Sequence, residues 1–351
     1  MKFVFTIQDY IERKLEHTYE NYINNCGFSG TDAQILEMTH WLNKMGHTSI
    51  IVKDTELINL KDIDDIDVFC CCFYVWLPNV INFCKILSPK TKVLLYIQSF
   101  ANCRQIFYLK KNVYIVGVSD YVKLYYSKYG YPYKTIYNAV NDKIFTNNTL
   151  DYESKKGNYV FFASYERGGE ICLKIFNKLA NTYDNIKLHI TSYEPSDIHK
   201  ISKNTPKNVN IYSSLSKKEI KKLLDKCDYF IYPLVNNITG SVHHDTFACV
   251  VLEALACGVS VVSWNVACLK NLYKDNVYLI DPPPYNGYNQ LHQFGYNINM
   301  VSDKSINLFV DKINEIEASP ELKLSKKIQA REWALSHTWE NKTKELLDFI
   351  S

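Results

Sequence analysis

Short apolar runs alternate with amphipathic helical patterns along most of the chain. In residues 31–45 the apolar side chains of Ile35, Met38 and Leu42 recur every three to four positions, which predicts a helix. Ser119 is expected to cap a second helix over residues 120–129. Buried strands are predicted at residues 2–7, 48–52, 68–76, 93–97 and 114–118. Strands that alternate with helices are typical of an α/β fold with parallel sheets.

The same alternation resumes after a polar stretch, residues 138–158, which is rich in Asn, Asp, Lys and Thr and lacks periodicity. We interpret its centre, residues 146–157, as an interdomain linker. Beyond it, strands are predicted at residues 159–164, 187–191, 209–212, 229–233, 259–264 and 277–280, and helices at residues 169–183, 217–226, 305–318 and from 322 onward. The pattern predicts two Rossmann-like domains, residues 1–145 and 158–335, with a loop-like, aromatic and Asn-rich insertion at residues 285–299.

Composition agrees with two packed domains and excludes several classes of protein. The chain has 351 residues, of which 47% are hydrophobic and 22% charged. A net charge of +3 is too small to indicate a nucleic-acid partner or a polybasic membrane anchor. The 11 cysteines form no Cys-x-x-Cys pair, so we expect buried free thiols in a reducing compartment. No apolar run approaches the roughly 20 residues that span a bilayer, which favours a cytoplasmic protein with at most peripheral membrane contact.

Residues 245–258 are the most informative stretch. Asp245 stands just before an apolar run, and Glu253 lies inside that run, which is predicted to be a helix that ends at Gly258. A helix N-terminus favours an anion such as a diphosphate. Asp245 alone is also explained as an N-cap or a partner of the helix dipole. A charged Glu253 on an apolar helix is normally paired or bound to something.

Two further segments follow predicted strands and precede predicted helices. Residues 29–31, Ser-Gly-Thr, lie where ligands meet the carboxyl ends of parallel strands, although an ordinary tight turn explains them equally well. Arg167, in Glu166-Arg167-Gly168-Gly169, has a guanidinium suited to phosphate oxygens, or is a surface residue at a turn. His243 and His244 point differently and have no third ligand at suitable spacing, so a metal site is disfavoured. The basic helix at residues 217–226 is expected to be a solvated face.

Taken in order, these segments resemble the retaining glycosyltransferases of the family 4 type. Residues 245–258 resemble the E-x7-E segment of that family, and Glu166-Arg167-Gly168 stands where the family has Glu-Lys-Gly or Asp-Arg-Gly. Residues 29–32 and 44–47 resemble the family's Gly-Gly-x-Glu loop and Arg-Gly-His helix end, residues 118–121 and 136–145 its Val-Ser-Glu-Tyr and Ile-Pro-Asn-Gly-Val segments, and residues 339–340 its Trp-Glu before the last helix. Each match is weak, but the ordered set is specific and covers nearly the whole chain.

The resemblance implies the GT-B fold, in which two Rossmann-like domains face each other across a cleft. It also implies that the C-terminal helix, residues 339–351, crosses back to the first domain. The implied reaction moves a sugar from a nucleotide-diphosphate sugar, such as a UDP- or GDP-sugar, to a hydroxyl of a glycan or small molecule. The anomeric configuration is retained, and neither a metal nor a cofactor is needed.

The resemblance further implies roles for individual residues. Arg167 would neutralise the diphosphate, Asp245 would hold hydroxyls of the donor sugar, and Glu253 would hold the ribose hydroxyls. Residues implied to bind the donor beside Arg167 and Glu253 are Gly30, Thr31, Gln98, Gly168, Thr246, Phe247 and Ala248.

The sequence departs from the family pattern at three points. Asp245 is one methylene shorter than the usual Glu, residues 160–166 lack the second base that the family often has, and Gln98 stands where the family often has His. These departures leave two other hypotheses open. One is a nucleotide-sugar epimerase on the same fold, which Gln98 disfavours because an amide cannot carry a proton charge. The other is a catalytically degenerate protein that binds sugar nucleotides or acts as a scaffold.

Overall fold

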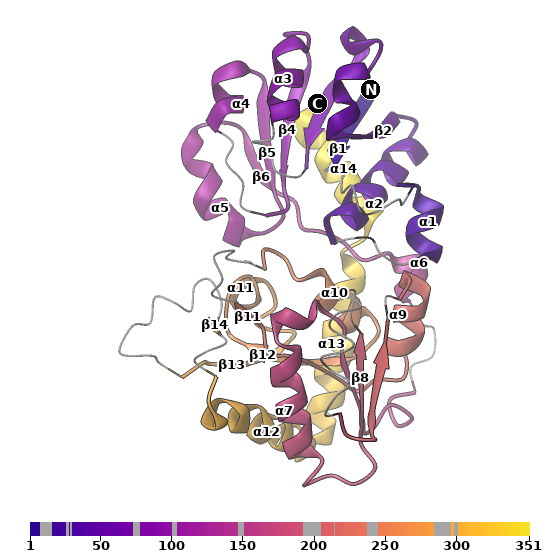
Figure 1. The fold of residues 1–351 in the computed structure, drawn as a ribbon, viewed down its shortest axis with the longest axis vertical. Coiled ribbons are helices and arrows are strands. Elements are labelled where there is room, and N and C mark those ends of the chain that lie inside the picture. Colours follow the sequence, from indigo (N-terminus) through magenta and orange to yellow (C-terminus); the bar gives the residue numbers. More distant parts are fainter. Residues whose placement is uncertain are drawn as a thin grey trace. The chain divides into compact units, whose positions relative to one another are not determined.

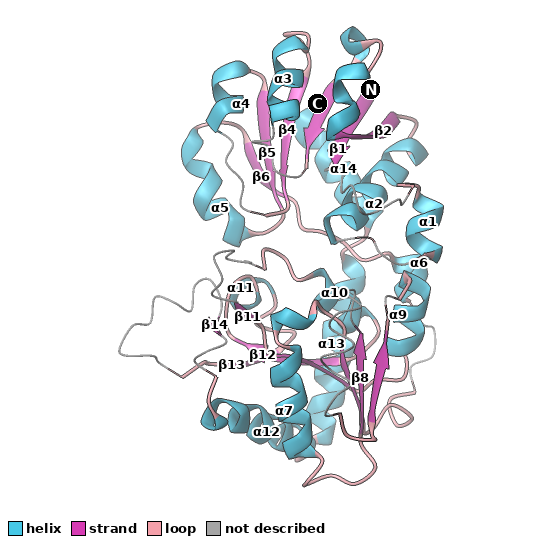
Figure 2. Cartoon of the chain, in the orientation of Figure 1, coloured by secondary structure: helices cyan, strands magenta, loops and turns pink. Residues whose placement is uncertain are grey.

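The structure is a computed structural model, and its fold is drawn in Figures 1 and 2. It describes residues 1–7, 16–25, 28, 30–72, 78–99, 104–146, 151–191, 205–213, 215–236, 245–283, 296–297 and 301–351. Ser29, His243, His244 and most of the predicted insertion at residues 285–299 lie outside the described residues. The chain forms two compact units: Met1–Ile23, Phe28–Ala139 and His337–Ser351 make the first, and Asn24–Gly27 and Val140–Ser336 make the second.

The first unit is built on a parallel sheet with the strand order β2-β1-β3-β4-β5-β6. Its strands are β1 (Lys2–Ile7), β2 (Thr48–Lys53), β3 (Val68–Cys71), β4 (Lys92–Ile97), β5 (Val113–Gly117) and β6 (Tyr133–Thr135). The central strands β1, β3 and β4 are buried almost throughout. Helices cover both faces of a parallel sheet, which explains why these strands appear in the sequence as unbroken apolar runs.

The helices of the first unit include one that comes from the end of the chain. They are α1 (Tyr19–Asn24), α2 (Gly30–Lys44), α3 (Pro78–Ile86), α4 (Arg104–Leu109), α5 (Asp120–Tyr126) and α14 (Trp339–Ile350). Figure 1 shows α14 in yellow among the indigo elements of this unit. Thr343 Oγ1 lies 3.4 Å from Met38 Sδ on α2, and Lys134 Nζ donates to the Glu345 carbonyl at 3.0 Å. The predicted return of the C-terminal helix to the first domain is confirmed.

The second unit has a parallel sheet with the order β13-β12-β10-β7-β8-β9. Its strands are β7 (Asn158–Phe161), β8 (Lys187–Thr191), β9 (Val209–Tyr212), β10 (Tyr229–Tyr232), β12 (Ser260–Trp264) and β13 (Tyr278–Ile280). The chain builds outward from β7 through β8 and β9, then returns to the other side of β7 with β10. The carboxyl ends of β7 and β10 therefore flank the switch point at which open α/β sheets bind ligands. The fold class predicted for both domains is confirmed.

Helices and a short strand pair complete the second unit. The helices are α6 (Asp142–Phe145), α7 (Gly169–Leu179), α9 (Lys217–Leu224), α10 (Cys249–Ala256), α11 (Leu269–Leu272), α12 (Asp303–Glu317) and α13 (Pro320–Ser336). The pair consists of β11 (Val235–Asn236) and β14 (Tyr296–Asn297). The apolar helix α10 is buried against β12 and α13, so an outward polar face is absent from most of its length.

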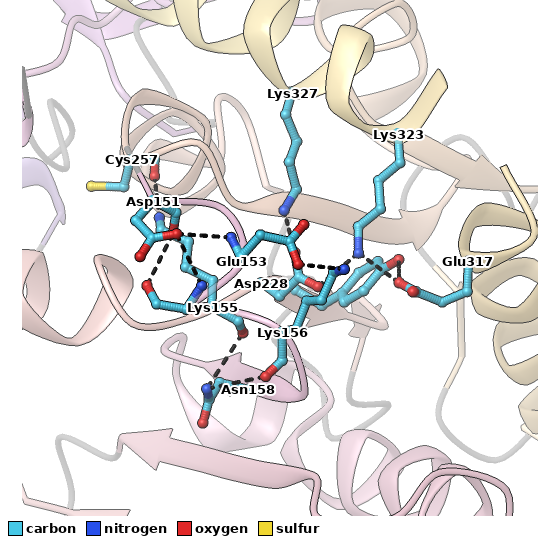
Figure 3. A network of polar contacts seen from close by, with 12 residues as sticks. Asp151, Glu153, Lys155, Lys156, Asn158, Asp228, Cys257, Glu317, Lys323 and Lys327 are labelled. Carbon is cyan, nitrogen blue, oxygen red and sulfur yellow. Dashed lines mark hydrogen bonds and ion pairs between the residues drawn. The ribbon is translucent and has the colours of Figure 1, made fainter. Parts of the chain in front are cut away.

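Buried charges connect α13 to the sheet of the second unit (Figure 3). Lys323 and Lys327 reach from α13 to the two carboxylate oxygens of Asp228, just before β10. Lys323 also pairs with Glu317 at 2.6 Å. Lys155, from the predicted linker, donates to the carbonyls of Leu224 at 3.4 Å and Cys257 at 2.7 Å. These carbonyls lie at the C-terminal ends of α9 and α10, where a cation is favoured.

Most differences from the predicted elements are at their ends. The helix predicted over residues 120–129 becomes a 3-10 turn, Ser127–Tyr129, after Tyr126. Ser119 does occupy its N-cap position, but its side chain makes no capping bond. The short helices α3 and α4 escaped prediction because nine and six residues give too few periods for a clear pattern. The nine described cysteines are free, and all but Cys249 are buried, as expected.

Candidate functional site

The loop after β7 brings Arg167 to the switch point of the second sheet. Tyr165–Arg167 forms a single 3-10 turn, and Gly168 follows with φ of 127°, a conformation that favours glycine. A Cβ on Gly168 would lie 2.5 Å from the carbonyl oxygen of Pro233, directly after β10. Gly168 is therefore required because the loop packs against the end of the neighbouring strand. This contact fixes the backbone from which the Arg167 side chain extends.

Three donors converge on the carboxylate of Asp245. Arg167 Nη1 lies 3.1 Å from Asp245 Oδ2, and the hydroxyl of Tyr232 donates to the same oxygen at 2.6 Å. The backbone N–H of Ala248 donates to Asp245 Oδ1 at 2.7 Å. Tyr232 is the last residue of β10 and is fully buried. Two residues predicted to bind the donor, Arg167 and Asp245, thus meet at the ends of the two strands that flank the switch point.

A tight turn separates Asp245 from α10, which begins at Cys249, three residues later than the sequence pattern suggested. Ala248 occupies the N-cap position in a left-handed conformation, with φ of 55°, and this conformation is strained for alanine. Its N–H donates to Asp245, and the Tyr273 hydroxyl shares its one proton between the carbonyls of Phe247 at 2.8 Å and Ala248 at 3.3 Å. The side chains of Thr246, Phe247 and Ala248 are buried in this turn.

Glu253 is the fifth residue of α10 and forms an ion pair with Lys217, the first residue of α9. The side chains of Lys217 and Glu253 are 18% and 9% exposed, so most of this pair is removed from water. The second carboxylate oxygen of Glu253, Oε2, is buried and has no hydrogen-bond partner among the described residues. A buried acceptor without a donor costs free energy, so this oxygen is suited to a ligand that brings a hydroxyl.

Electrostatics fix the protonation states of Arg167 and Tyr232. Burial works against the charged guanidinium, but the Asp245 carboxylate and Tyr232 outweigh it and raise the pKa of Arg167 above its ordinary value. Burial, followed by the negative charge of Asp245, raises the pKa of Tyr232 well above its ordinary value. Arg167 therefore stays charged, and Tyr232 stays a neutral donor, over the whole working range of pH.

The other predicted residues belong to the first unit. Gly30 begins α2, and a Cβ there would meet nothing within 4 Å, so the local packing does not require glycine. Thr31 is the second residue of the same helix. Gln98 is buried just after β4. Its side-chain amide makes two hydrogen bonds with that of Asn138: Gln98 Nε2 donates to Asn138 Oδ1 at 3.3 Å, and Asn138 Nδ2 donates to Gln98 Oε1 at 3.1 Å. The roles of these three residues in binding a donor stay predictions.

Sequence reasoning missed two side chains of the second-unit site. Lys217 lies in the basic helix expected to be a solvated face, but it pairs with Glu253 and is mostly buried. The capping box of Ser216 and Glu219 was a signal that Lys217 starts a helix, although not that it points to α10. Tyr232 gave no signal, because a tyrosine in an apolar strand is normally a core residue.

Among the residues that the structure describes, no group of His, Cys, Asp and Glu has the geometry to hold a metal ion. Within the same residues, no helix is both long enough and apolar enough to pass through a membrane.

The two parallel six-stranded sheets with their covering helices, and the return of α14, define the class of GT-B proteins. Solved structures share this fold. A sucrose-phosphate synthase from Thermosynechococcus elongatus is 10% identical, has a TM-score of 0.69, and the match covers 99% of this chain and 97% of that chain. HepE from Anabaena, solved with UDP and glucose, is 12% identical with a TM-score of 0.68 and coverage of 99% and 98%. A glycosyltransferase from Rickettsia africae ESF-5 is 13% identical with a TM-score of 0.68 and coverage of 99% and 97%.

The sequence itself identifies the family. Residues 142–333, more than half of the chain, match the family model described as Glycosyl transferases group 1. The chain belongs to this family and is a glycosyltransferase. No curated protein matches the sequence.

Proposed function

We propose that this glycosyltransferase moves a sugar from a nucleotide-diphosphate sugar to a hydroxyl of a glycan or small molecule, with retention of anomeric configuration. It needs neither a metal nor another cofactor. The observation that carries the proposal is a pair of groups: the Arg167 cation, bound to Asp245 just before α10, and an oxygen of Glu253 on α10 that has no hydrogen-bond partner among the described residues. The fold is shared with HepE bound to UDP and glucose, which favours a UDP-sugar as the first donor to test. The cytoplasmic location stays a prediction.

Arg167 binds the donor diphosphate. When the bond between the sugar and the diphosphate breaks, negative charge grows on the leaving phosphate oxygen, and a fixed cation stabilises this charge. Arg167 is held by Asp245 and carries a raised pKa, so it provides a permanent positive charge. The N-terminal end of α10 carries the positive end of the helix dipole and favours the same anion. These two features replace the divalent metal that other phosphate-transferring sites use.

Glu253 binds the ribose of the donor. Its Oε2 atom accepts a hydroxyl of the sugar ring, while Lys217 neutralises Oε1. Glu253 lies about 6 Å along the axis from the first residue of α10, at a rise of ~1.5 Å per residue. One nucleoside diphosphate is long enough to contact both the helix N-terminus and this carboxylate.

The reaction is a displacement on one face of the sugar. The bond from the anomeric carbon to the diphosphate oxygen breaks, and the acceptor oxygen forms its bond to that carbon from the same side. The acceptor proton passes to the leaving phosphate oxygen, so no protein base is required. Gln98 stands where the family often has a histidine, and its amide cannot carry a proton charge. This agrees with a route that needs no protein base.

Incubation with a panel of UDP-, GDP- and dTDP-sugars tests the proposal. We expect one donor to bind and to be consumed, and we expect Arg167→Ala and Glu253→Ala to lose turnover by about 100-fold or more. Lys218→Ala, an exposed residue beside Lys217, is the matched control and keeps the wild-type rate. Wild-type turnover in both site variants contradicts the assignment. A product formed without any acceptor, with the sugar still attached to the nucleotide, indicates an epimerase instead.

A further inference from the structure

The carboxylate of Asp245 is almost fully occupied by the protein itself. An ionised carboxylate accepts about four hydrogen bonds. From the described residues Asp245 receives three: from Arg167 and Tyr232 on Oδ2, and from the N–H of Ala248 on Oδ1. The residue is 8% exposed. Its geometry is that of a residue that holds other groups in place.

Tyr232 is the buried member of this set. It ends β10, and the Gly168 backbone packs against the next residue, Pro233, so Tyr232 and the Arg167 loop are fixed at adjoining strand ends. The Tyr232 side chain is removed from water, and its hydroxyl donates to Asp245 at 2.6 Å. A hydrogen bond from a neutral hydroxyl to a carboxylate is short and strong compared with one between neutral groups. Tyr232 thereby locks the oxygen atom to which Arg167 is also bound.

We propose that Tyr232 is a positioning residue for sugar transfer, which fixes Asp245 so that Asp245 in turn aims Arg167 at the donor diphosphate. The inference rests on the proposed function of Arg167. It gives Asp245 a different role from that implied by the family resemblance, in which this carboxylate holds sugar hydroxyls. The shorter aspartate accounts for the change, because its side chain folds back onto the turn at Ala248.

The same strand offers a matched control. Tyr229, the first residue of β10, is also buried, and its hydroxyl also donates to a carboxylate, that of Glu317. Tyr229→Phe and Tyr232→Phe each remove one buried hydroxyl bonded to a carboxylate, from opposite ends of one strand. A purely structural contribution is similar in both variants. A contribution to the reaction belongs to Tyr232 alone.

The experiment compares the kinetics of Tyr232→Phe and Tyr229→Phe on the donor that the sugar-nucleotide panel identifies. We expect Tyr232→Phe to fold and to lose about 10- to 100-fold in kcat, because a displaced guanidinium stabilises the transition state poorly. KM for the donor changes less than kcat, since the long-range charge attraction remains. Tyr229→Phe stays within about twofold of the wild type. Equal losses in the two variants overturn the inference.

A double-mutant cycle separates positioning from general damage. In the Arg167→Ala background the guanidinium that Tyr232 positions is absent. We therefore expect Tyr232→Phe to cause no further loss of turnover. Losses that multiply in the double variant show that Tyr232 acts independently of Arg167 and overturn the inference alone. Full activity of Arg167→Ala overturns the proposed function together with the inference. The two failures are therefore distinguishable.

Discussion

At position 245 one methylene group decides which atoms a carboxylate can reach. The Asp245 side chain is short enough to accept the N–H of Ala248 three residues later, and this contact helps to hold Ala248 in its left-handed conformation. A glutamate there would extend beyond the turn. The sequence predicted that Asp245 and Arg167 serve one site, and the structure brings them within 3.1 Å. The sequence could not predict that Tyr232 joins this site, because strand ends approach each other only after the sheet has formed.

Lys217 provides a prediction at this scale. Lys217→Met leaves the buried Glu253 carboxylate without its cation. We therefore expect the free energy of unfolding to fall by about 1–3 kcal/mol. This is below the range for fully buried pairs, because Lys217 is partly exposed. Urea unfolding measures this loss of stability. Lys218→Met, at the exposed neighbour, should cost less than ~0.5 kcal/mol. Adding Glu253→Gln to Lys217→Met should restore part of the loss, because a neutral amide is cheaper to bury. Equal stabilities of the two lysine variants would contradict the pairing.

At the scale of elements, the pattern of apolar runs predicted the strands well because parallel strands are buried on both faces. Two buried strands predicted at residues 2–7 and 187–191 match β1 and β8 in full. The strand predicted at residues 209–212 also matches β9 in full, although β9 is a partly exposed edge strand. The start of α10 was missed, since a left-handed alanine leaves no mark in the sequence. The connection between α13 and the sheet was also missed, because Lys323 and Lys327 look like solvated residues until Asp228 is placed beside them.

The buried Lys327 makes the connection of α13 dependent on pH. Burial, partly offset by Asp228, lowers the pKa of Lys327 from 10.5 to about 8 in the folded protein. Between these two values the unfolded chain binds more protons than the folded one, so this group stabilises the fold as pH rises. The contribution is complete above the unfolded pKa and is lost as pH falls through about 8.

The measurement is the stability difference between the wild type and Lys327→Met at several pH values. We expect the difference to shift in favour of the wild type from pH 8 to pH 10, with a slope of up to ~1.4 kcal/mol per pH unit. Titration of tyrosines and cysteines is common to both proteins and cancels. A difference that stays constant with pH would show that Lys327 titrates at its ordinary value.

At the scale of the molecule, the two structural units are not two continuous halves of the sequence. Residues His337–Ser351 belong to the first unit, although they follow α13 of the second directly. Trp339, Leu346 and Ile350 of α14 are buried there, so the last helix is part of the core of the first unit. A substitution near the C-terminus should therefore change the stability of the first unit, which contains the N-terminus.

Leu346→Ala tests this assignment against Leu347→Ala, the adjacent and partly exposed leucine. Leu346 is 1% exposed, so its truncation leaves a cavity and should destabilise the first unit by about 2–4 kcal/mol. Hydrogen exchange followed by mass spectrometry reports each strand separately. We expect faster exchange in β4, β5 and β6, whose residues Lys92, Tyr114 and Lys134 contact α14, and unchanged exchange in β7, β10 and β12. Leu347→Ala should change either group little. If Leu346→Ala instead accelerates exchange in β10 and β12, α14 belongs energetically to the second unit, because a core substitution acts first on the strands it packs against.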